Sequence, residues 1–269
     1  MTIDRTFMKQ ALRAALAAGK EVLRIYLQPD HEVQLKADQT PVTLADHKAH
    51  AVLHELLCPS GLPLLSEEGP DIPYVQRRRW TDFWMLDPLD GTREFIRKNG
   101  EFTVNVAYIH HGRPHLGVVY APAANQIWYG EVGRGAWMAG THPGIVAEEL
   151  MEAARPLPLP ATDRPYRVVA SRSHMNDATR DFMARHLSDH RVNEIVSRGS
   201  SLKLCMIAEG SADIYPRFGP TMEWDTAAGH AIVLASGGDL LDTEHHTSLE
   251  YNKPNLLNPS FIAKKSERA

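Results

Sequence analysis

Residues 84–92 read Trp-Met-Leu-Asp-Pro-Leu-Asp-Gly-Thr, and this stretch decides how the chain is interpreted. The apolar residues before Asp87 predict a buried strand, and Gly91 allows a sharp turn after Asp90. Two carboxylates and the Leu89 carbonyl group are oxygen ligands of the kind that Mg²⁺ binds. A helix that starts after the glycine also directs backbone N–H groups toward a phosphate. A surface Asp-Pro-Leu-Asp-Gly turn is the alternative, but the apolar strand that leads into it favours function.

Other segments carry carboxylates that can join this turn. Glu67 and Glu68 follow a short apolar run that predicts a strand. Adjacent carboxylates on a loop are usually solvated unless a cation holds them. Asp225 stands in Glu-Trp-Asp-Thr-Ala-Ala-Gly, where the expected structural role is the N-cap of a helix. Asp46 ends the segment Thr-Leu-Ala-Asp, which is typical of a capping box.

The composition is that of an ordinary globular protein. Of 269 residues, 43% are hydrophobic and 23% are charged, and the formal net charge of -4 argues against a nucleic-acid polymer as partner. No apolar run reaches the roughly 18 residues of a membrane span, and the first 26 residues lack the apolar segment of a signal peptide. Two cysteines, Cys58 and Cys205, favour a reduced cytoplasmic protein.

Helical and extended patterns alternate irregularly, which predicts α+β layers rather than a dinucleotide-binding sheet. Neither G-x-G-x-x-G nor a Walker A sequence occurs. We expect an N-terminal metal-binding lobe over 1–150 and a C-terminal nucleotide-binding lobe over 151–269, with the active site between them. Residues 70–80, Pro-Asp-Ile-Pro-Tyr-Val-Gln-Arg-Arg-Arg-Trp, read as a surface loop.

The Glu-Glu pair, the Asp-Pro-x-Asp-Gly-Thr turn and the late Trp-Asp-x-Ala-Ala segment together resemble the inositol monophosphatase family, in the same order and over nearly the whole chain. The resemblance implies an α+β fold, a layered α/β/α/β/α sandwich. Haloacid-dehalogenase phosphatases carry an Asp-x-Asp-Gly-Thr motif instead. Here two residues separate Asp87 from Asp90, so the spacing excludes that class and its covalent nucleophile.

Four further segments resemble the 3'(2'),5'-bisphosphate nucleotidases of the CysQ type within this family. They are residues 92–105, 171–174 (Ser-Arg-Ser-His), 199–203 (Gly-Ser-Ser-Leu-Lys) and 215–220 (Tyr-Pro-Arg-Phe-Gly-Pro). Arg93 departs from the lysine expected there, and a planar guanidinium is not equivalent to an ammonium group.

The resemblance implies a lithium-sensitive hydrolase that removes the 3'-phosphate of adenosine 3',5'-bisphosphate, giving AMP and phosphate, with a role in sulfur assimilation. It implies two or three Mg²⁺ ions and assigns them to Glu67, Asp87, the Leu89 carbonyl group, Asp90 and Asp225. It assigns catalysis to Glu67, with Asp46 and Thr92 as the pair that orients or deprotonates the attacking water. It assigns substrate contacts to Asp90, Gly91, Thr92, His174, Ser200, Ser201, Lys203, Arg217 and Asp225.

The residue chemistry of 199–217 agrees with a second phosphate that the metal ions cannot reach. Ser200 and Ser201 stand at an expected helix start, and Lys203 and Arg217 add positive charge. His174 can donate a hydrogen bond or stack. Ordinary N-capping and a solvated lysine remain the alternatives for these residues taken singly.

Two other functions remain open at this stage. One is the same chemistry on inositol monophosphate or another sugar phosphate, and the other is a phosphonucleotide-binding regulator without turnover. The expected partner is a small molecule, with the chain a monomer or homodimer. The expected location is the cytoplasm, with peripheral association to the inner membrane implied by the resemblance alone.

Overall fold

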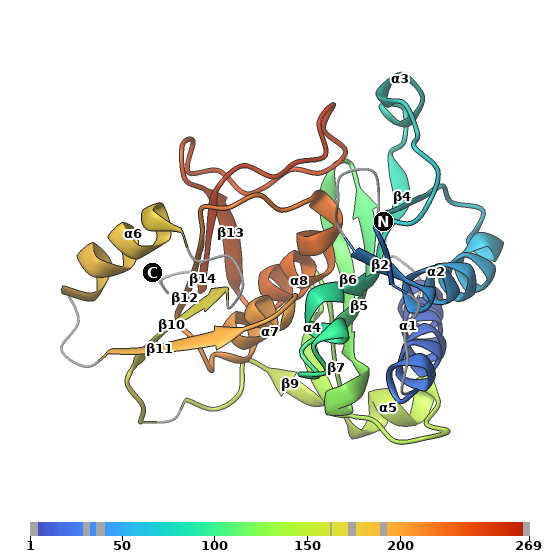
Figure 1. Ribbon diagram of the computed structural model, residues 1–269, viewed down its shortest axis with the longest axis horizontal. Coiled ribbons are helices and arrows are strands. Elements are labelled where there is room, and N and C mark those ends of the chain that lie inside the picture. The colour runs from blue at the N-terminus through green and yellow to red at the C-terminus, as the bar shows by residue number, and fades with distance from the viewer. Residues whose placement is uncertain are drawn as a thin grey trace.

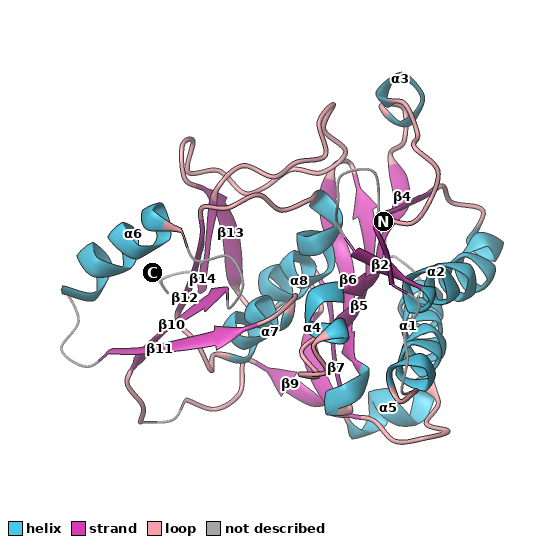
Figure 2. Cartoon of the chain, viewed as in Figure 1, coloured by secondary structure: helices cyan, strands magenta, loops and turns pink. Residues whose placement is uncertain are grey.

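A computed structural model describes residues 5–28, 33–35, 41–161, 163–171, 176–188 and 193–265. These residues stack as α/β/α/β/α layers, which confirms the predicted fold class. Figure 1 shows the layers running from α1 and α2 on one side of the molecule to α6 on the other. Two sheets, visible as separate groups of strands in Figure 2, enclose the central helices.

The first sheet has seven strands in chain order, so each strand pairs with its neighbours in sequence. The strands are β3 (Leu64–Ser66), β4 (Asp82–Asp90), β5 (Thr103–His110), β6 (Arg113–Ala121), β7 (Gln126–Glu131), β8 (Gly135–Gly140) and β9 (Arg155–Leu157). β3 and β4 are parallel, and the other pairs are antiparallel. β4 and β5 are buried along almost their whole length because helices cover both faces of the sheet.

Helices of the N-terminal half cover the outer face of this sheet. α1 (Arg5–Tyr26) packs on α2 (Leu44–Leu57) and on β5 and β6, and α5 (Ala147–Ala153) lies against α1 and β8. Two short helices, α3 (Tyr74–Arg77) and α4 (Thr92–Ile96), flank β4 in the chain. A small hairpin, β1 (Val33–Leu35) with β2 (Pro41–Thr43), precedes α2.

The C-terminal half supplies the other layers. α7 (Leu202–Glu209) and α8 (Glu223–Ala235) lie between the two sheets, and α8 packs on β5, β6 and β7. The second sheet has the order β11-β10-β12-β14-β13. Its strands are β10 (Tyr166–Ser171), β11 (Asn193–Arg198), β12 (Ile214–Arg217), β13 (Gly238–Asp242) and β14 (Phe261–Lys265), and α6 (Asp177–Ser188) lies near β12.

Two details bear on the expected organisation. β9 still pairs with the first sheet although it lies beyond residue 150, and β10 opens the second sheet at Tyr166. The prediction of a surface loop at 70–80 was wrong in one respect, because this segment forms α3 and buries Arg77.

Gly117 lets α8 approach the first sheet closely. A Cβ atom at this position of β6 would lie 2.1 Å from the carbonyl oxygen of Ala228 on α8. Backbone cannot yield as a flexible side chain can, so a larger residue here forces the helix off the sheet. Since α8 also carries Asp225, the position of that carboxylate depends on this contact.

We predict that Gly117→Ala destabilises the fold by about 1–3 kcal/mol, the usual range for overpacking a core. Gly140→Ala is the matched control, because Gly140 also lies in this sheet and a Cβ atom there meets nothing within 4 Å. Urea unfolding of both variants measures the difference. Equal stability of the two variants would contradict the close approach of α8.

Candidate active site

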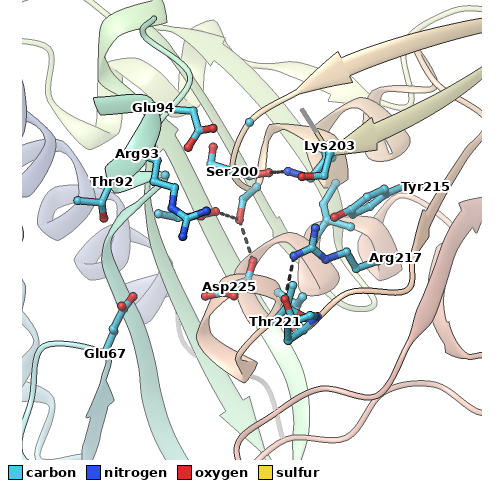
Figure 3. Close-up of a pocket in the computed structure, with 18 of the residues that line it drawn as sticks. Glu67, Thr92, Arg93, Glu94, Ser200, Lys203, Tyr215, Arg217, Thr221 and Asp225 are labelled. Atoms are coloured by element: carbon cyan, nitrogen blue, oxygen red, sulfur yellow. Dashed lines mark hydrogen bonds between the residues drawn. The ribbon is translucent and has the colours of Figure 1, made fainter. Parts of the chain in front are cut away.

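A cavity of about 240 Å³ opens where the two halves of the chain meet. It is lined from the end of β4, the beginning of α4, the loop before α7, the end of β12 and the beginning of α8. In Figure 3, Glu67, Thr92 and Asp225 lie toward one end of the cavity, and Lys203, Tyr215 and Arg217 lie toward the other. We call the end with Glu67 and Asp225 the acidic end, although Arg93 lies beside Thr92 there, and the end with Lys203 and Arg217 the basic end.

The acidic end brings together three carboxylates that are distant in sequence. Oxygens of Glu67, Asp87 and Asp225 all lie within 4.8 Å of one another. Burial raises the pKa of Asp87 and of Asp225 well above the usual value, and the charges of the neighbouring carboxylates raise both further. Among the described residues, the Asp87 Oδ2 atom is buried without a hydrogen-bond partner. A divalent cation would satisfy that oxygen and offset the repulsion, so the residues fit a metal site.

The turn after β4 sets the directions of its two carboxylates. The pairing of β4 with β5 shifts register between Asp87 and Asp90. Asp87 Oδ1 accepts a 3.1 Å bond from the Leu89 N–H group. Gly91 then adopts φ +91°, in the left-handed region that favours glycine, and α4 begins at the next residue.

Thr92 lies beside a buried carboxylate of α2. Its Oγ1 atom is 3.3 Å from Asp46 Oδ1 and 3.3 Å from the Leu89 carbonyl oxygen. Asp46 completes the predicted capping box, because its Oδ2 atom accepts bonds from the Thr43 N–H and hydroxyl groups. Burial raises the pKa of Asp46, and the bonds from Thr43 lower it in part. One helix cap thus fixes the orientation of the carboxylate that faces Thr92.

The prediction that Asp225 is an N-cap was wrong. Met222 caps α8, and Asp225 is the third residue of the helix, where its Oδ2 atom accepts a 2.8 Å bond from the Met222 N–H group. Ser201 connects the end of β4 to the first turn of α8. Its hydroxyl oxygen lies 2.9 Å from Asp90 Oδ2 and 2.9 Å from the Asp225 carbonyl oxygen.

Asn105 is a site residue to which the sequence analysis gave no role. Its side chain is buried on β5 and donates a 2.9 Å bond to the Ser201 hydroxyl group. Its Nδ2 atom is also 3.5 Å from Asp90 Oδ2. The available signal was an amide in the middle of an apolar strand, since a buried amide needs a partner.

The basic end holds cations with little access to water. Lys203 and Arg217 are each 6% exposed. Lys203 donates a hydrogen bond to the Ser200 carbonyl group, and its Nζ atom lies over the ring of Tyr215, 5.5 Å from the ring centroid. Burial lowers the pKa of Lys203 to about 8, although Asp90 opposes this shift. Arg217 donates a 2.8 Å bond to the Pro220 carbonyl group.

Two polar atoms at the basic end are poised for a ligand. The Ser200 hydroxyl oxygen and the Arg217 Nε atom are buried without a hydrogen-bond partner in the described part of the chain. Ser200 adopts φ +43°, an uncommon conformation for serine. Both residues line the cavity, and unpaired donors beside cations suit an anion such as phosphate.

Most of the predicted site residues therefore lie together. The cavity is lined by Glu67, Asp90, Gly91, Thr92, Ser200, Ser201, Lys203, Arg217 and Asp225. Asp87, Asp46 and Leu89 adjoin it through the contacts above. His174 lies outside the described residues. The lining also includes Glu94, Tyr215 and Thr221, which the sequence analysis did not assign.

Comparison with known proteins agrees with this geometry. The model of the inositol monophosphatase family matches residues 4–268. The chain is 44% identical to the 3'(2'),5'-bisphosphate nucleotidase CysQ of Salmonella typhimurium and 42% identical to that of Escherichia coli strain K12. Each match covers 94% of this chain and 98% of the relative.

Solved structures give the same picture. The crystal structure of CysQ from Bacteroides thetaiotaomicron has a TM-score of 0.87 and 42% identity, and covers 96% of this chain and 97% of that one. The suhB protein of Bartonella henselae has a TM-score of 0.76 at 24% identity, with coverage of 97% and 94%, and shares the fold. In the described residues, no helix is long and apolar enough to span a membrane.

We predict that Asp87→Asn raises the melting temperature of the metal-free protein, because it removes a buried carboxyl group whose ionisation is opposed by burial and by the neighbouring carboxylates. The same variant should lose the rise in melting temperature that Mn²⁺ gives the native chain. Thermal melts with EDTA and with Mn²⁺ measure both effects, with exposed Asp71→Asn as control. An unchanged response to Mn²⁺ would remove Asp87 from the metal site.

Proposed function

Because the chain belongs to the inositol monophosphatase family, we propose that it is a Mg²⁺-dependent 3'(2'),5'-bisphosphate nucleotidase that hydrolyses adenosine 3',5'-bisphosphate to AMP and phosphate. The observation that carries the proposal is the presence of two anion-binding chemistries in one cavity. A carboxylate cluster suits metal ions at one end, and buried cations suit a second phosphate at the other. A monophosphate substrate would leave the basic end without a bound anion.

Glu67, Asp87, Asp90, Asp225 and the Leu89 carbonyl group would hold two or three Mg²⁺ ions. When bound, Mg²⁺ lowers the pKa of a water molecule and neutralises charge on the phosphate. The chain's own contribution is to hold these oxygens close together against their repulsion. The Leu89 N–H and Met222 N–H groups do this by bonding one oxygen each of Asp87 and Asp225.

Thr92 and Asp46 would orient the attacking water. The single hydroxyl proton of Thr92 can be donated in a hydrogen bond to Asp46, whose Oδ1 atom lies 3.3 Å away. The Thr92 oxygen can then accept a hydrogen bond from water, which aims a lone pair of that water at the phosphorus atom. The raised pKa of Asp46 makes its carboxylate a better proton acceptor than a solvated aspartate.

Lys203, Arg217 and the Ser200 hydroxyl group would bind the phosphate that is not cleaved, and His174 would add a contact to the nucleotide. This remote binding can orient the 3'-phosphate at the metal ions. We further propose the two lobes 1–150 and 151–269, a cytoplasmic location and a role in recycling adenosine 3',5'-bisphosphate from sulfur assimilation.

We predict that Lys203→Ala lowers kcat/KM for adenosine 3',5'-bisphosphate by ~10- to 100-fold, because a charge-assisted hydrogen bond contributes about 1.5–3 kcal/mol. Adenosine 3'-monophosphate, which lacks the second phosphate, should be almost unaffected. Measuring both substrates on both proteins gives a double difference from which general damage to the fold cancels. Equal losses on the two substrates would show that Lys203 is structural, and would count against the proposed specificity.

The pH dependence gives a separate prediction. Because burial lowers the pKa of Lys203 to about 8, its positive charge in the free protein disappears as pH rises through that value. The kcat/KM for the bisphosphate should therefore fall above about pH 8 more steeply than that for the 3'-monophosphate. Lys203→Arg should remove this extra fall, since arginine stays charged. Parallel pH profiles for the two substrates would contradict the assignment.

A further inference from the structure

Arg77 forms an unusually well-bonded buried contact outside the cavity. It is the last residue of α3, and only 3% of it is exposed. Its Nη1 atom donates to Asn252 Oδ1 at 2.9 Å and to the Lys253 carbonyl group at 2.6 Å, and its Nη2 atom donates to the Pro254 carbonyl group at 2.9 Å. In return, Asn252 donates its amide to the Arg77 carbonyl group at 2.8 Å. Arg77 therefore binds residues 252–254 as one unit.

Glu223 binds the same three-residue loop from another side. It is the first residue of α8 and is fully buried. Its carboxylate accepts bonds from the Asn252 N–H group at 2.5 Å, from the Lys253 N–H group at 3.0 Å and from Lys253 Nζ at 2.5 Å. Asn252 adopts φ +69°, in the left-handed region. Arg77, the 252–254 loop and Glu223 thus form a continuous chain of hydrogen bonds, which we name the Arg77–Glu223 link.

The link connects the two chain segments that carry the proposed metal ligands. Arg77 lies in the segment between Glu67 and Asp87, an excursion of the chain away from the site. Glu223 lies two residues before Asp225, in the first turn of α8. Oxygens of these three ligands lie within 4.8 Å of one another, and their like charges push the excursion and α8 apart. A buried link between the same two segments opposes that separation.

We propose that Arg77 and Glu223 are positioning residues that keep Glu67 and Asp87 in register with Asp225, and so set the affinity of the site for divalent cations. The proposal rests on the metal site of the proposed function, but it does not depend on which phosphate ester is the substrate. Direct hydrogen-bond partners of metal ligands typically change metal affinity by 10- to 100-fold. The Arg77–Glu223 link acts one step further out, through the backbone segments that carry the ligands.

The test compares Arg77→Met with Arg164→Met in the full-length chain. Methionine keeps much of the apolar stem and removes the donors. Arg164 is the matched control, because its guanidinium also makes several bonds: to Asp213, to the Pro165 carbonyl group and to the Gly210 carbonyl group at the far end of α7. Titration calorimetry with Mn²⁺, without substrate, measures metal affinity, and thermal melts in EDTA measure stability.

We expect both arginine variants to lower the melting temperature, but only Arg77→Met to weaken Mn²⁺ binding, by ~10-fold or more. Glu223→Gln keeps the shape of the side chain and should weaken Mn²⁺ binding in the same direction. It also carries the test if Arg77→Met does not fold. Because its ligands are intact, the Arg77 variant should recover most of its kcat at saturating Mg²⁺ while its half-saturating Mg²⁺ concentration rises.

Native Mn²⁺ affinity in Glu223→Gln, or in a folded Arg77→Met variant, would overturn the proposal. Equal weakening in the Arg77 and Arg164 variants would overturn it too, since the effect would then be general destabilisation. A native chain that binds Mn²⁺ but does not hydrolyse the bisphosphate would refute the proposed function and leave this test valid.

Discussion

Mutual repulsion among closely spaced carboxylates is the constraint on which the site depends. Glu67, Asp87 and Asp225 come from three separate segments, yet their oxygens lie within 4.8 Å of one another. Separation would relieve the repulsion, and the fold prevents it in several ways. Gly117 lets α8 lie close on the first sheet, and backbone N–H groups bond one oxygen each of Asp87 and Asp225. The fold thus maintains an arrangement that a divalent cation stabilises.

The two ends of the cavity are joined by polar contacts rather than by apolar packing alone. Ser201 lies at the beginning of α7, bonded to Asn105 and within 2.9 Å of both Asp90 and the Asp225 backbone. Lys203 follows two residues later and lies at the basic end. A shift of α7 would therefore move the acidic end and the basic end together. This suits a reaction in which one phosphate is aligned for cleavage while the other is bound.

Local motifs predicted the residues of the site well. The turn around Asp87 and Asp90 and the capping box of Asp46 are each encoded within a few residues, so their geometry follows from glycine, proline and capping preferences. The assembly of these pieces into one cavity followed from family resemblance, since no spacing in the chain specifies which strands and helices meet.

Long-range contacts explain what the sequence analysis missed. Asp225 resembled an N-cap, but Met222 is the N-cap of α8 and the helix begins at Glu223. There the Glu223 carboxylate accepts hydrogen bonds from the Asn252 and Lys253 N–H groups, which are distant in sequence. Residues 70–80 read as a surface loop because they are rich in arginine and proline. The groups that accept hydrogen bonds from buried Arg77 lie about 175 residues further along the chain, so nothing in the sequence near Arg77 indicates them.

The most direct test of the account is phosphate release by the native chain from adenosine 3',5'-bisphosphate, adenosine 3'-monophosphate and inositol 1-phosphate, each with Mg²⁺ and with EDTA. We expect the highest kcat/KM for the bisphosphate, and no turnover of any substrate in EDTA. Preference for inositol 1-phosphate would contradict the nucleotidase assignment and leave the metal site standing. Absence of turnover on all three substrates with Mg²⁺ would contradict an enzymatic role and favour a phosphonucleotide-binding regulator.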